Sequence, residues 1–345
     1  MKSLRFRMVA LLVIVTPMMI GVSKLTLALP NDSSGTAQGA ELDLIARSAY
    51  EDLPAALARL QHHRERNLST CRAGDMPSHN STNRAIPATL NNCDASQWPL
   101  DALGAYLEAQ YGQNNDKLRA HADRLRALSS QAGTLQGVDA TDASAWADLI
   151  GMTLAARQGQ HEVVAGLAQS ALRVLQPACK EAGALPTSCN YRLTWEVLRT
   201  NATAQIMQGA KTLSLNEHRQ ALELAKRAKD RYRSALSTAD VARALFRVDE
   251  RSEAKRLYEH SLTIAQGDPT LLAQLMVASG AIVTPDEPRE SMRAMQEALS
   301  LALQTQSVHL AARVRTNLSD VHLKLGQPQQ ALVEARAALP VMQKY

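Results

Sequence analysis

The most suggestive metal-binding stretch in this sequence is His62-His63 followed by Glu65. Adjacent residues of a helix do not face each other, and no third ligand follows at a usable spacing. A closed metal site needs three or four converging ligands, so we interpret the stretch as a solvated helix end. His161-Glu162 lacks the second histidine, four residues later, that a zinc protease motif requires. The sequence therefore predicts no metal site.

Common catalytic signatures are also missing from the sequence. It contains no Gly-x-Ser-x-Gly turn, no phosphate-cradling glycine loop and no dinucleotide fingerprint. Its adjacent carboxylates, Asp249-Glu250 and Asp286-Glu287, stand where helices are expected to begin, and the helix dipole favours negative charge there. We therefore predict a protein that is not an enzyme and that has neither catalytic residues nor a cofactor.

The four cysteines, Cys71, Cys93, Cys179 and Cys189, are spaced too widely for zinc-type Cys-x2-4-Cys pairs or for a redox Cys-x-x-Cys. Four cysteines allow three pairings. We predict Cys71–Cys93 and Cys179–Cys189, because each of these bonds would close an irregular polar loop at its own base. Such disulfides form in an oxidising compartment.

Residues 1–28 have the layout of an export signal. A basic start precedes an apolar run over residues 8–22, and Ala28 ends a small-residue cleavage site. The run is shorter than the roughly 20 residues that a membrane-spanning helix needs. We therefore expect cleavage and a periplasmic or secreted protein. An uncleaved anchor in the inner membrane stays open, because apolar residues at 25, 27 and 29 prolong the run. Only in that case would a membrane be a partner.

Charge argues against a nucleic-acid partner. The formal charge is +5, but four basic residues and no acidic residue precede position 29. Without that segment, 34 basic residues (38 less 4) face 33 acidic ones, so the exported chain would be nearly neutral. A local basic excess persists between Lys211 and Arg256, and we interpret it as a solvated helix face rather than a patch for an acidic partner.

Apolar residues recur at helical spacing along most of the chain, and aromatic residues make up only 3% of it, which favours close-packed helices. A polar linker at 29–40 precedes helical pairs in 41–138, where the Cys71–Cys93 loop lies. Further pairs fill 141–345. There we expect Pro177 to end a helix, residues 217–236 to form one helix, and a capping box at 284–287 to open another.

The clearest pair is Val308–Met342, in which two amphipathic stretches flank Gly326-Gln327-Pro328. Small residues stand at the closest approach of the two stretches and at the turn, namely Ser319, Gly326, Ala331, Ala335 and Ala338. This pattern resembles the tetratricopeptide repeat (TPR), although the usual aromatics are missing and His322 stands where tyrosine is common. The resemblance implies an all-α, TPR-like α-solenoid of antiparallel helix pairs. Its helix-B equivalents would be Ala221, Ala254, Met292 and Ala331, at intervals of 33, 38 and 39 residues.

TPR arrays, by this resemblance, bind a protein or peptide on a concave face lined by the first helix of each pair. In the last repeat Arg313, Asn317, Asp320 and Lys324 lie on about that face. Asn317 could bond a ligand backbone, and Arg313 or Lys324 could hold a carboxylate. The alternative is an ordinary polar surface.

The last helix has no successor to cover Leu332, Leu339 and Met342. Since a solenoid usually ends with a polar capping face, we predict a docking surface here, either for a homodimer or for the partner.

An export signal followed by an alanine- and leucine-rich TPR array is also similar to the periplasmic sensing region of bacterial signalling proteins of the GGDEF diguanylate cyclase type. This sequence contains no output domain of that kind. Two functions are therefore expected: an exported scaffold that binds a protein or peptide partner in the cell envelope, or a stand-alone or truncated sensor module.

Overall fold

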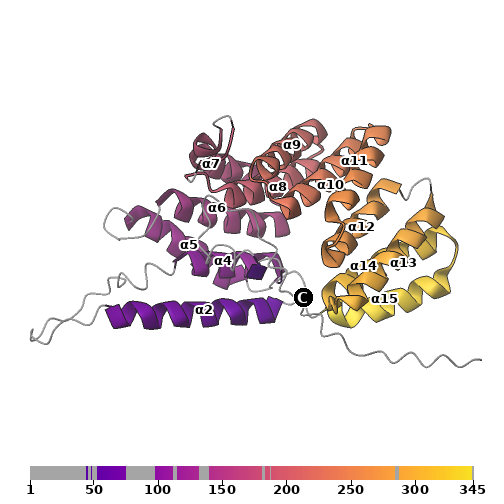
Figure 1. The fold of residues 1–345 in the computed structure, drawn as a ribbon, viewed down its shortest axis with the longest axis horizontal. Coiled ribbons are helices and arrows are strands. Elements are labelled where there is room, and N and C mark those ends of the chain that lie inside the picture. Colours follow the sequence, from indigo (N-terminus) through magenta and orange to yellow (C-terminus); the bar gives the residue numbers. More distant parts are fainter. Residues whose placement is uncertain are drawn as a thin grey trace, which may run out of the picture. The chain divides into compact units, whose positions relative to one another are not determined.

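The computed structural model describes residues 44, 45, 48, 53–74, 98–111, 115–131, 140–180, 183–186, 188–283 and 287–343. All of them belong to one compact unit, Asp32–Tyr345. Within these residues the chain forms thirteen helices with defined bounds and no strand (Figure 1). The predicted signal segment 1–28 and linker 29–40 lie outside the described residues. No helix among those described is both long enough and apolar enough to span a membrane.

Helix α2 (Leu53–Gly74) is the first helix with defined bounds, and the helices that follow it along the chain form antiparallel pairs. The pairs are α4 (Trp98–Tyr111) with α5 (Asn115–Gln131), α6 (Ala140–Arg157) with α7 (His161–Cys179), α8 (Tyr191–Met207) with α9 (Lys211–Arg227), α10 (Arg231–Arg247) with α11 (Arg251–Ala265), α12 (Pro269–Val283) with α13 (Pro288–Gln304), and α14 (Val308–Lys324) with α15 (Pro328–Met342). The all-α helical-repeat prediction is confirmed.

Packing follows the order of the chain. Each second helix packs on its own first helix and on the first helix of the next pair. First helices also pack on one another, α4 on α6, α6 on α8, α10 on α12 and α12 on α14, whereas successive second helices in the described part of the chain do not. We call α4, α6, α8, α10, α12 and α14 the first-helix row. First helices therefore pack more closely on one another than second helices do.

Six of the tight turns share one hydrogen-bond pattern. A residue in the left-handed region follows the helix, and the next N–H donates to the carbonyl five residues earlier, as from Gln160 to Ala155 at 2.9 Å and from Gln327 to His322 at 2.9 Å. This is the Schellman arrangement, which satisfies carbonyls that a helix end leaves open. Glycine supplies the left-handed residue at Gly159, Gly209 and Gly326, but Lys229, Asp249 and Gln306 adopt it too.

The repeat register differs from the predicted one. The last four first helices begin at residues 191, 231, 269 and 308, so the period is 38 to 40 residues. The buried small residues that occupy the same place in the second helices are Ser214, Ala254, Ser291 and Ala331. The predicted use of Ala221 was wrong because Ala221 lies two turns further along its helix, where its equivalents are Ser261, Ala298 and Ala338. The apparent 33-residue interval came from that shift.

Several helix limits also correct the sequence-based expectations. Pro177 lies inside α7, because proline removes one hydrogen bond but its φ suits the last turn. Residues 217–236 form two helices, since Lys229 adopts a φ of 53° and Asp230 caps α10 by accepting from the Arg233 N–H at 2.9 Å. Helix α13 begins at Pro288 with Glu287 before it. Residues 284–286 of the predicted capping box lie outside the described residues.

Two expectations near the N-terminus also change. Helix α2 continues to Gly74, so Cys71 is helical rather than the start of a loop. His63 is buried within α2 while His62 is exposed, because adjacent residues point to different sides of a helix. The interpretation of this stretch as a solvated helix end was therefore wrong.

The hydrophobic core is continuous through the first half of the described chain. One cluster of buried residues runs from Ile45 and α2 through α4–α7 to Leu193 and Val197 of α8. Smaller clusters follow around the remaining pairs, such as the one that joins α12, α13 and α14 through Met295 and Leu310. Residues 132–139, where a module boundary was predicted, lie outside the described residues. The division into 41–138 and 141–345 stays a prediction.

Candidate functional site

A tryptophan interrupts the regular spacing of the first-helix row. Trp195 of α8 occupies the position that alanine holds in the next three first helices, at Ala235, Ala273 and Ala312, and all four residues are buried. The small alanines let neighbouring helices approach closely. Among the successive first helices described from α4 onwards, α8 and α10 make the least close backbone contact. The indole therefore separates α8 from α10, and other side chains fill the gap.

Trp195 belongs to an apolar cluster with Leu198 and Leu224, and polar and positively charged side chains contact it as well. Its indole N–H donates to the Ser237 hydroxyl of α10 at 2.7 Å. The Arg199 guanidinium lies over the ring, 4.4 Å from the centroid, and that of Arg233 lies 5.2 Å away. Cation–π contacts of this kind strengthen when the groups are removed from water, as they are here. The junction is thus aromatic and ionic, unlike the apolar contacts further along the row.

A buried carboxylate organises these cations. Asp240 of α10 is 3% exposed; it accepts from Arg199 of α8 at 2.6 Å and also pairs with Arg243 one turn further along α10. Burial alone would raise the pKa of Asp240, but the two guanidinium groups outweigh it and hold that pKa well below its usual range. Burial likewise opposes the charge of Arg199, but Asp240 and Glu196 raise its pKa. The carboxylate stays ionised and fixes both guanidinium groups in place.

His218 of α9 adjoins this network from the second-helix side. It is 3% exposed, and its Nδ1 has no hydrogen-bond partner in the described structure. Burial, with the positive charges of Arg199 and Arg243 acting against the nearby Asp240, lowers the pKa of His218 from 6.5 to about 4. At neutral pH His218 is therefore uncharged and adds no charge to the network.

The polar contacts continue along the row in both directions. On α8, Glu196 accepts from the Tyr106 hydroxyl of α4 at 2.8 Å, and Tyr106 stacks edge-on against Trp146 of α6 with ring centroids 5.7 Å apart. In the other direction Tyr232 of α10 donates to Gln274 of α12 at 3.4 Å. Polar and aromatic side chains thus connect five first helices, from α4 to α12, across the junction.

Part of this network reaches the solvent. The side chains of Arg199 and Arg243 are 27% and 40% exposed, while that of Asp240 is 4% exposed. Arg192, Glu196 and Thr203 lie on the same face of α8 as Arg199, at helical spacings of three and four residues. A guanidinium held from behind by a buried carboxylate still presents donors on its other edge. We call Arg192, Arg199 and Arg243 the row arginines; Asp240 fixes two of them, Arg199 and Arg243, which makes these two a candidate site for a carboxylate or a backbone carbonyl.

The residues predicted for partner binding lie on the last pair. Arg313, Asp320 and Lys324 are exposed on α14. Asn317 donates its amide to the Val277 carbonyl of α12 at 3.1 Å, so its donor joins two first helices. Leu332, Leu339 and Met342 are exposed on α15. The structure therefore keeps this set apart from the Asp240 network, and its role in binding stays a prediction.

Sequence reasoning missed Trp195, Arg199 and Asp240. The signal that could have found them is a tryptophan in a column of alanines, which becomes visible only when the repeats are aligned at 38 to 40 residues. The basic excess was interpreted correctly only in part. Lys226, Lys229 and Arg231 are exposed, as a solvated face requires. Arg227 and Arg231 also donate to backbone carbonyls of neighbouring segments, and Arg233 is buried beside Asp230.

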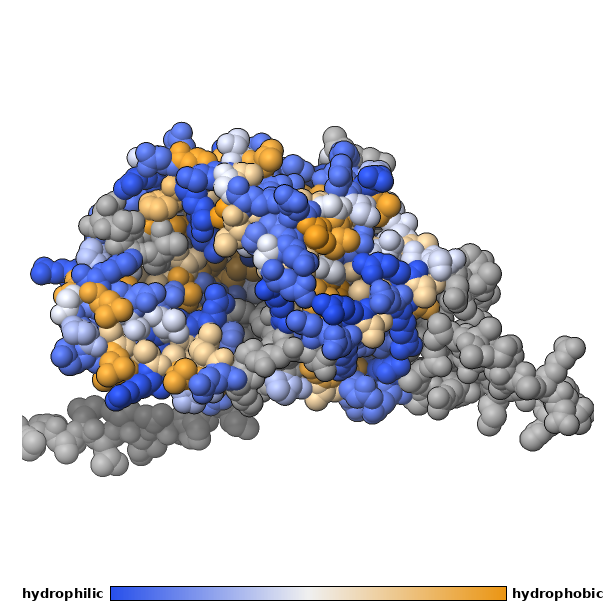
Figure 2. Space-filling model, turned by 180° about the vertical axis from the view of Figure 1, so that it is seen from behind, coloured by the Kyte–Doolittle hydropathy of each residue, from blue (hydrophilic) through white to orange (hydrophobic). Residues whose placement is uncertain are grey.

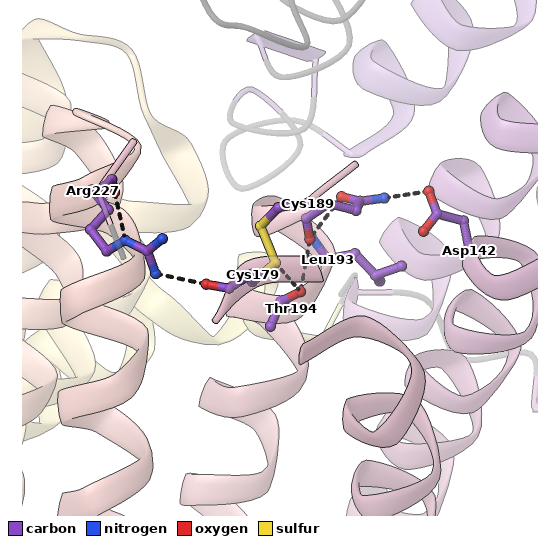
Figure 3. The surroundings of a disulfide bond; sticks show 8 residues. Asp142, Cys179, Cys189, Leu193, Thr194 and Arg227 are labelled. Atoms are coloured by element: carbon purple, nitrogen blue, oxygen red, sulfur yellow. Dashed lines mark hydrogen bonds between the residues drawn. A yellow bond between two sulfur atoms is a disulfide. The ribbon is translucent and has the colours of Figure 1, made fainter. Parts of the chain in front are cut away.

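The predicted Cys179–Cys189 disulfide is confirmed. It closes the connection between α7 and α8, and Figure 3 shows how this connection is held on both sides. Arg227 of α9 donates to the Cys179 carbonyl at 2.6 Å, and Asn190 donates to Asp142 of α6 at 2.7 Å while its oxygen caps α8. The side chain of Cys71 and the whole of Cys93 lie outside the described residues, so that second pairing stays a prediction.

The described residues show neither a metal-binding cluster nor a single large hydrophobic patch on the face that is drawn in Figure 2. No group of three or more His, Cys, Asp or Glu among the described residues could hold a metal ion. On the face drawn in Figure 2, hydrophobic residues are interspersed with hydrophilic ones. The row arginines are therefore the best-defined candidate for ligand recognition.

Comparison with known proteins supports the fold and extends no further. No protein-family model matches the chain, and no curated protein matches its sequence. Among solved structures, the chain is similar to apo RapI, with 10% identity, 88% of this chain and 98% of the other covered, and a TM-score of 0.54. A Rap protein complexed with Competence and Sporulation Factor gives the same identity and coverage with a TM-score of 0.52. Aspartyl phosphate phosphatase F from Bacillus subtilis matches with 10% identity over 73% of this chain and 64% of its own, at a TM-score of 0.52. These likenesses identify a TPR-like helical-repeat fold.

Proposed function

We propose that this protein is a helical-repeat scaffold of the cell envelope that binds a protein or peptide partner along the first-helix row. The observation that carries the proposal is the pair of partly exposed guanidinium groups, Arg199 and Arg243, fixed by the buried carboxylate of Asp240. A buried ion pair is costly to assemble, and replacing it with apolar side chains often does not reduce stability. The network is therefore better explained by recognition than by stability alone.

The partner's chemistry follows from the donors that the site offers. Guanidinium groups bind carboxylates through two parallel hydrogen bonds, and fixing them beforehand reduces the entropy lost on binding. We therefore expect an acidic side chain or a terminal carboxylate of the partner at Arg199 and Arg243. The fold likeness to a Rap protein complexed with Competence and Sporulation Factor supports a binding role. The likeness to a phosphatase concerns the fold, and we propose that the chain is not an enzyme.

The test begins with the partner that co-purifies with the chain from the cell envelope after cross-linking. Its affinity would then be measured for the wild-type chain, for Arg243→Ala and for Arg256→Ala. The control is matched, because Arg256 forms an i,i+3 ion pair with Glu253 as Arg243 does with Asp240, but on the second helix α11. We expect at least a tenfold loss of affinity for Arg243→Ala alone. Equal affinities for all three proteins would refute the proposed site.

A second candidate function is a sensor module related to the periplasmic regions of GGDEF diguanylate cyclases. The layout of residues 1–28 supports this alternative, since a retained anchor would connect the helical array to the inner membrane. Replacing residues 1–28 with a cleavable export signal separates the two functions. A scaffold keeps its partner after this replacement, whereas a sensor loses its signalling output. N-terminal sequencing of the exported protein shows which form exists.

A further inference from the structure

An apolar stripe on α15 is left uncovered. Leu332, Ala335, Leu339 and Met342 follow one another at spacings of three, four and three residues, the spacing of a two-helix seam. All four are exposed, and the three large side chains are 50%, 52% and 41% exposed in chain order. The adjacent side of the helix, with Ala331 and Ala338, is buried against α14. No charged residue lies within the stripe.

The preceding repeat shows what this stripe is shaped to contact. Forty residues earlier, α13 carries Met292, Met295, Leu299 and Ala302 at the equivalent positions. There the stripe packs against α14, and Met295 and Ala302 are completely buried. The stripe on α15 therefore occupies the same positions as the α13 surface that contacts α14.

The neighbouring edge of α14 differs from the edge of α12 that supports α14. On α12 the residues that support the next first helix include Met276 and Val277, which join the core shared with α14. Their equivalents on α14, 39 residues later, are Arg315 and Thr316. Arg315 pairs with Glu334 of α15 at 2.8 Å, so this edge is polar. A further first helix would meet less apolar surface here than α14 meets on α12 and α13, whereas a helix that contacts α15 alone can use the whole stripe.

We propose that the occupant is α15 of a second copy of this chain, in antiparallel orientation. When two copies of the stripe are aligned about their common centre, Leu332 faces the partner subunit's Met342 and Ala335 faces the partner subunit's Leu339. Each central large side chain thus lies opposite a small one, which lets the helices approach closely. A two-fold axis needs a self-complementary patch, and the 3-4-3 spacing reads the same from both ends.

Sedimentation of the purified chain over a concentration series tests the association. One helix seam is smaller than a standard protein interface, so we expect a reversible dimer with a Kd of roughly 10 µM. Leu339→Arg should weaken it at least tenfold without loss of helical circular dichroism, because residue 339 is exposed in the monomer. Leu303→Arg is the control, since Leu303 is 55% exposed on α13 outside the stripe. A wild-type monomer up to roughly ten times that Kd, or equal weakening by both variants, overturns the proposal.

Orientation is tested by oxidising a mixture of two variants that each carry one added cysteine, Ala335→Cys and Leu339→Cys. An antiparallel seam brings residue 335 of one copy beside residue 339 of the other, so the predominant disulfide-linked product should be the mixed dimer. A parallel seam would link like with like, and that result would overturn the arrangement. An unidentified partner helix at this site would produce neither product and would contradict self-association.

Discussion

Trp195 determines the local character of the first-helix row because the equivalent residues in three other repeats are alanines. Its ring needs more space than close-packed helices leave. The polar side chains that share this space must provide one another's hydrogen bonds and counter-charges. Asp240 does most of this, since it accepts from two arginines and is removed from solvent. The three residues act as one unit, so substitutions within it should not be independent.

Asp240→Asn should therefore be among the most damaging single changes in the chain. It removes the buried carboxylate that holds the partly exposed Arg199 and Arg243, and breaking a pair of this kind costs up to about 3 kcal/mol. Chemical denaturation of the variant would measure the loss. Glu253→Gln, which removes the acid of the solvent-exposed i,i+3 pair with Arg256, should leave the denaturation midpoint unchanged. Similar midpoints for the two variants would contradict the structural importance of the Asp240 network.

His218 should make stability depend on pH. The unfolded chain binds a proton at a pKa near 6.5, but the folded chain does so only at about 4. Its contribution is therefore fully present above pH 6.5 and is lost as the pH falls towards 4, by up to about 3 kcal/mol. His218→Met, which copies Met295 at the equivalent position of α13, should remove this part of the pH dependence. An unchanged pH profile in urea denaturation would show that His218 is not the responsible group.

At the scale of the element, some turns carry backbone strain that is not evident from their sequence. Lys229 and Gln306 adopt positive φ in turns where Gly159, Gly209 and Gly326 do so without steric cost. Lys229→Gly and Gln306→Gly should each stabilise the chain by up to about 1 kcal/mol, because relief of the left-handed conformation exceeds the added chain entropy. Thermal melting would measure the gain. Gly326→Ala, the reverse change at an equivalent turn, should lower the melting temperature.

The connection between α7 and α8 depends on its disulfide. Cys179 and Cys189 are ten residues apart, and closing a loop of this size stabilises by about 3 kcal/mol in the chain-entropy model. Replacing both cysteines with serine should lower the free energy of unfolding by about this amount, as measured in denaturant. A reducing agent should have a smaller effect on this variant than on the wild-type chain. A variant as stable as the wild type would contradict the role assigned to the bond.

The sequence was informative about elements whose boundaries carry glycine or proline. Gly326 and Pro328 marked the last pair. The break at Lys229 was missed because a positive φ at lysine leaves no trace in the pattern, and apolar residues keep their helical spacing on both sides. That miss displaced the repeat register and hid the Trp195 position. The Asp240 network could not be predicted either, since its members come from three helices and meet only after packing.

At the scale of the whole molecule, the described chain is a series of helix pairs with one modified junction in its middle and one uncovered stripe at its last helix. The apolar contacts between first helices on either side of the junction supply ordinary repeat packing. The row arginines at the junction supply the recognition that we propose. This division assigns binding to the first-helix row and leaves the second helices, such as α11, as the outer support.

Site-specific photo-cross-linking tests this division most directly. A photoreactive residue would replace Thr203 of α8 in one variant and Thr263 of α11 in another, and each variant would be irradiated with the partner isolated from the cell envelope. The two positions match, because each threonine is exposed and donates its hydroxyl to the carbonyl four residues earlier in its helix. The account predicts a cross-link to the partner from position 203 and none from position 263. Cross-linking from position 263 alone would contradict it.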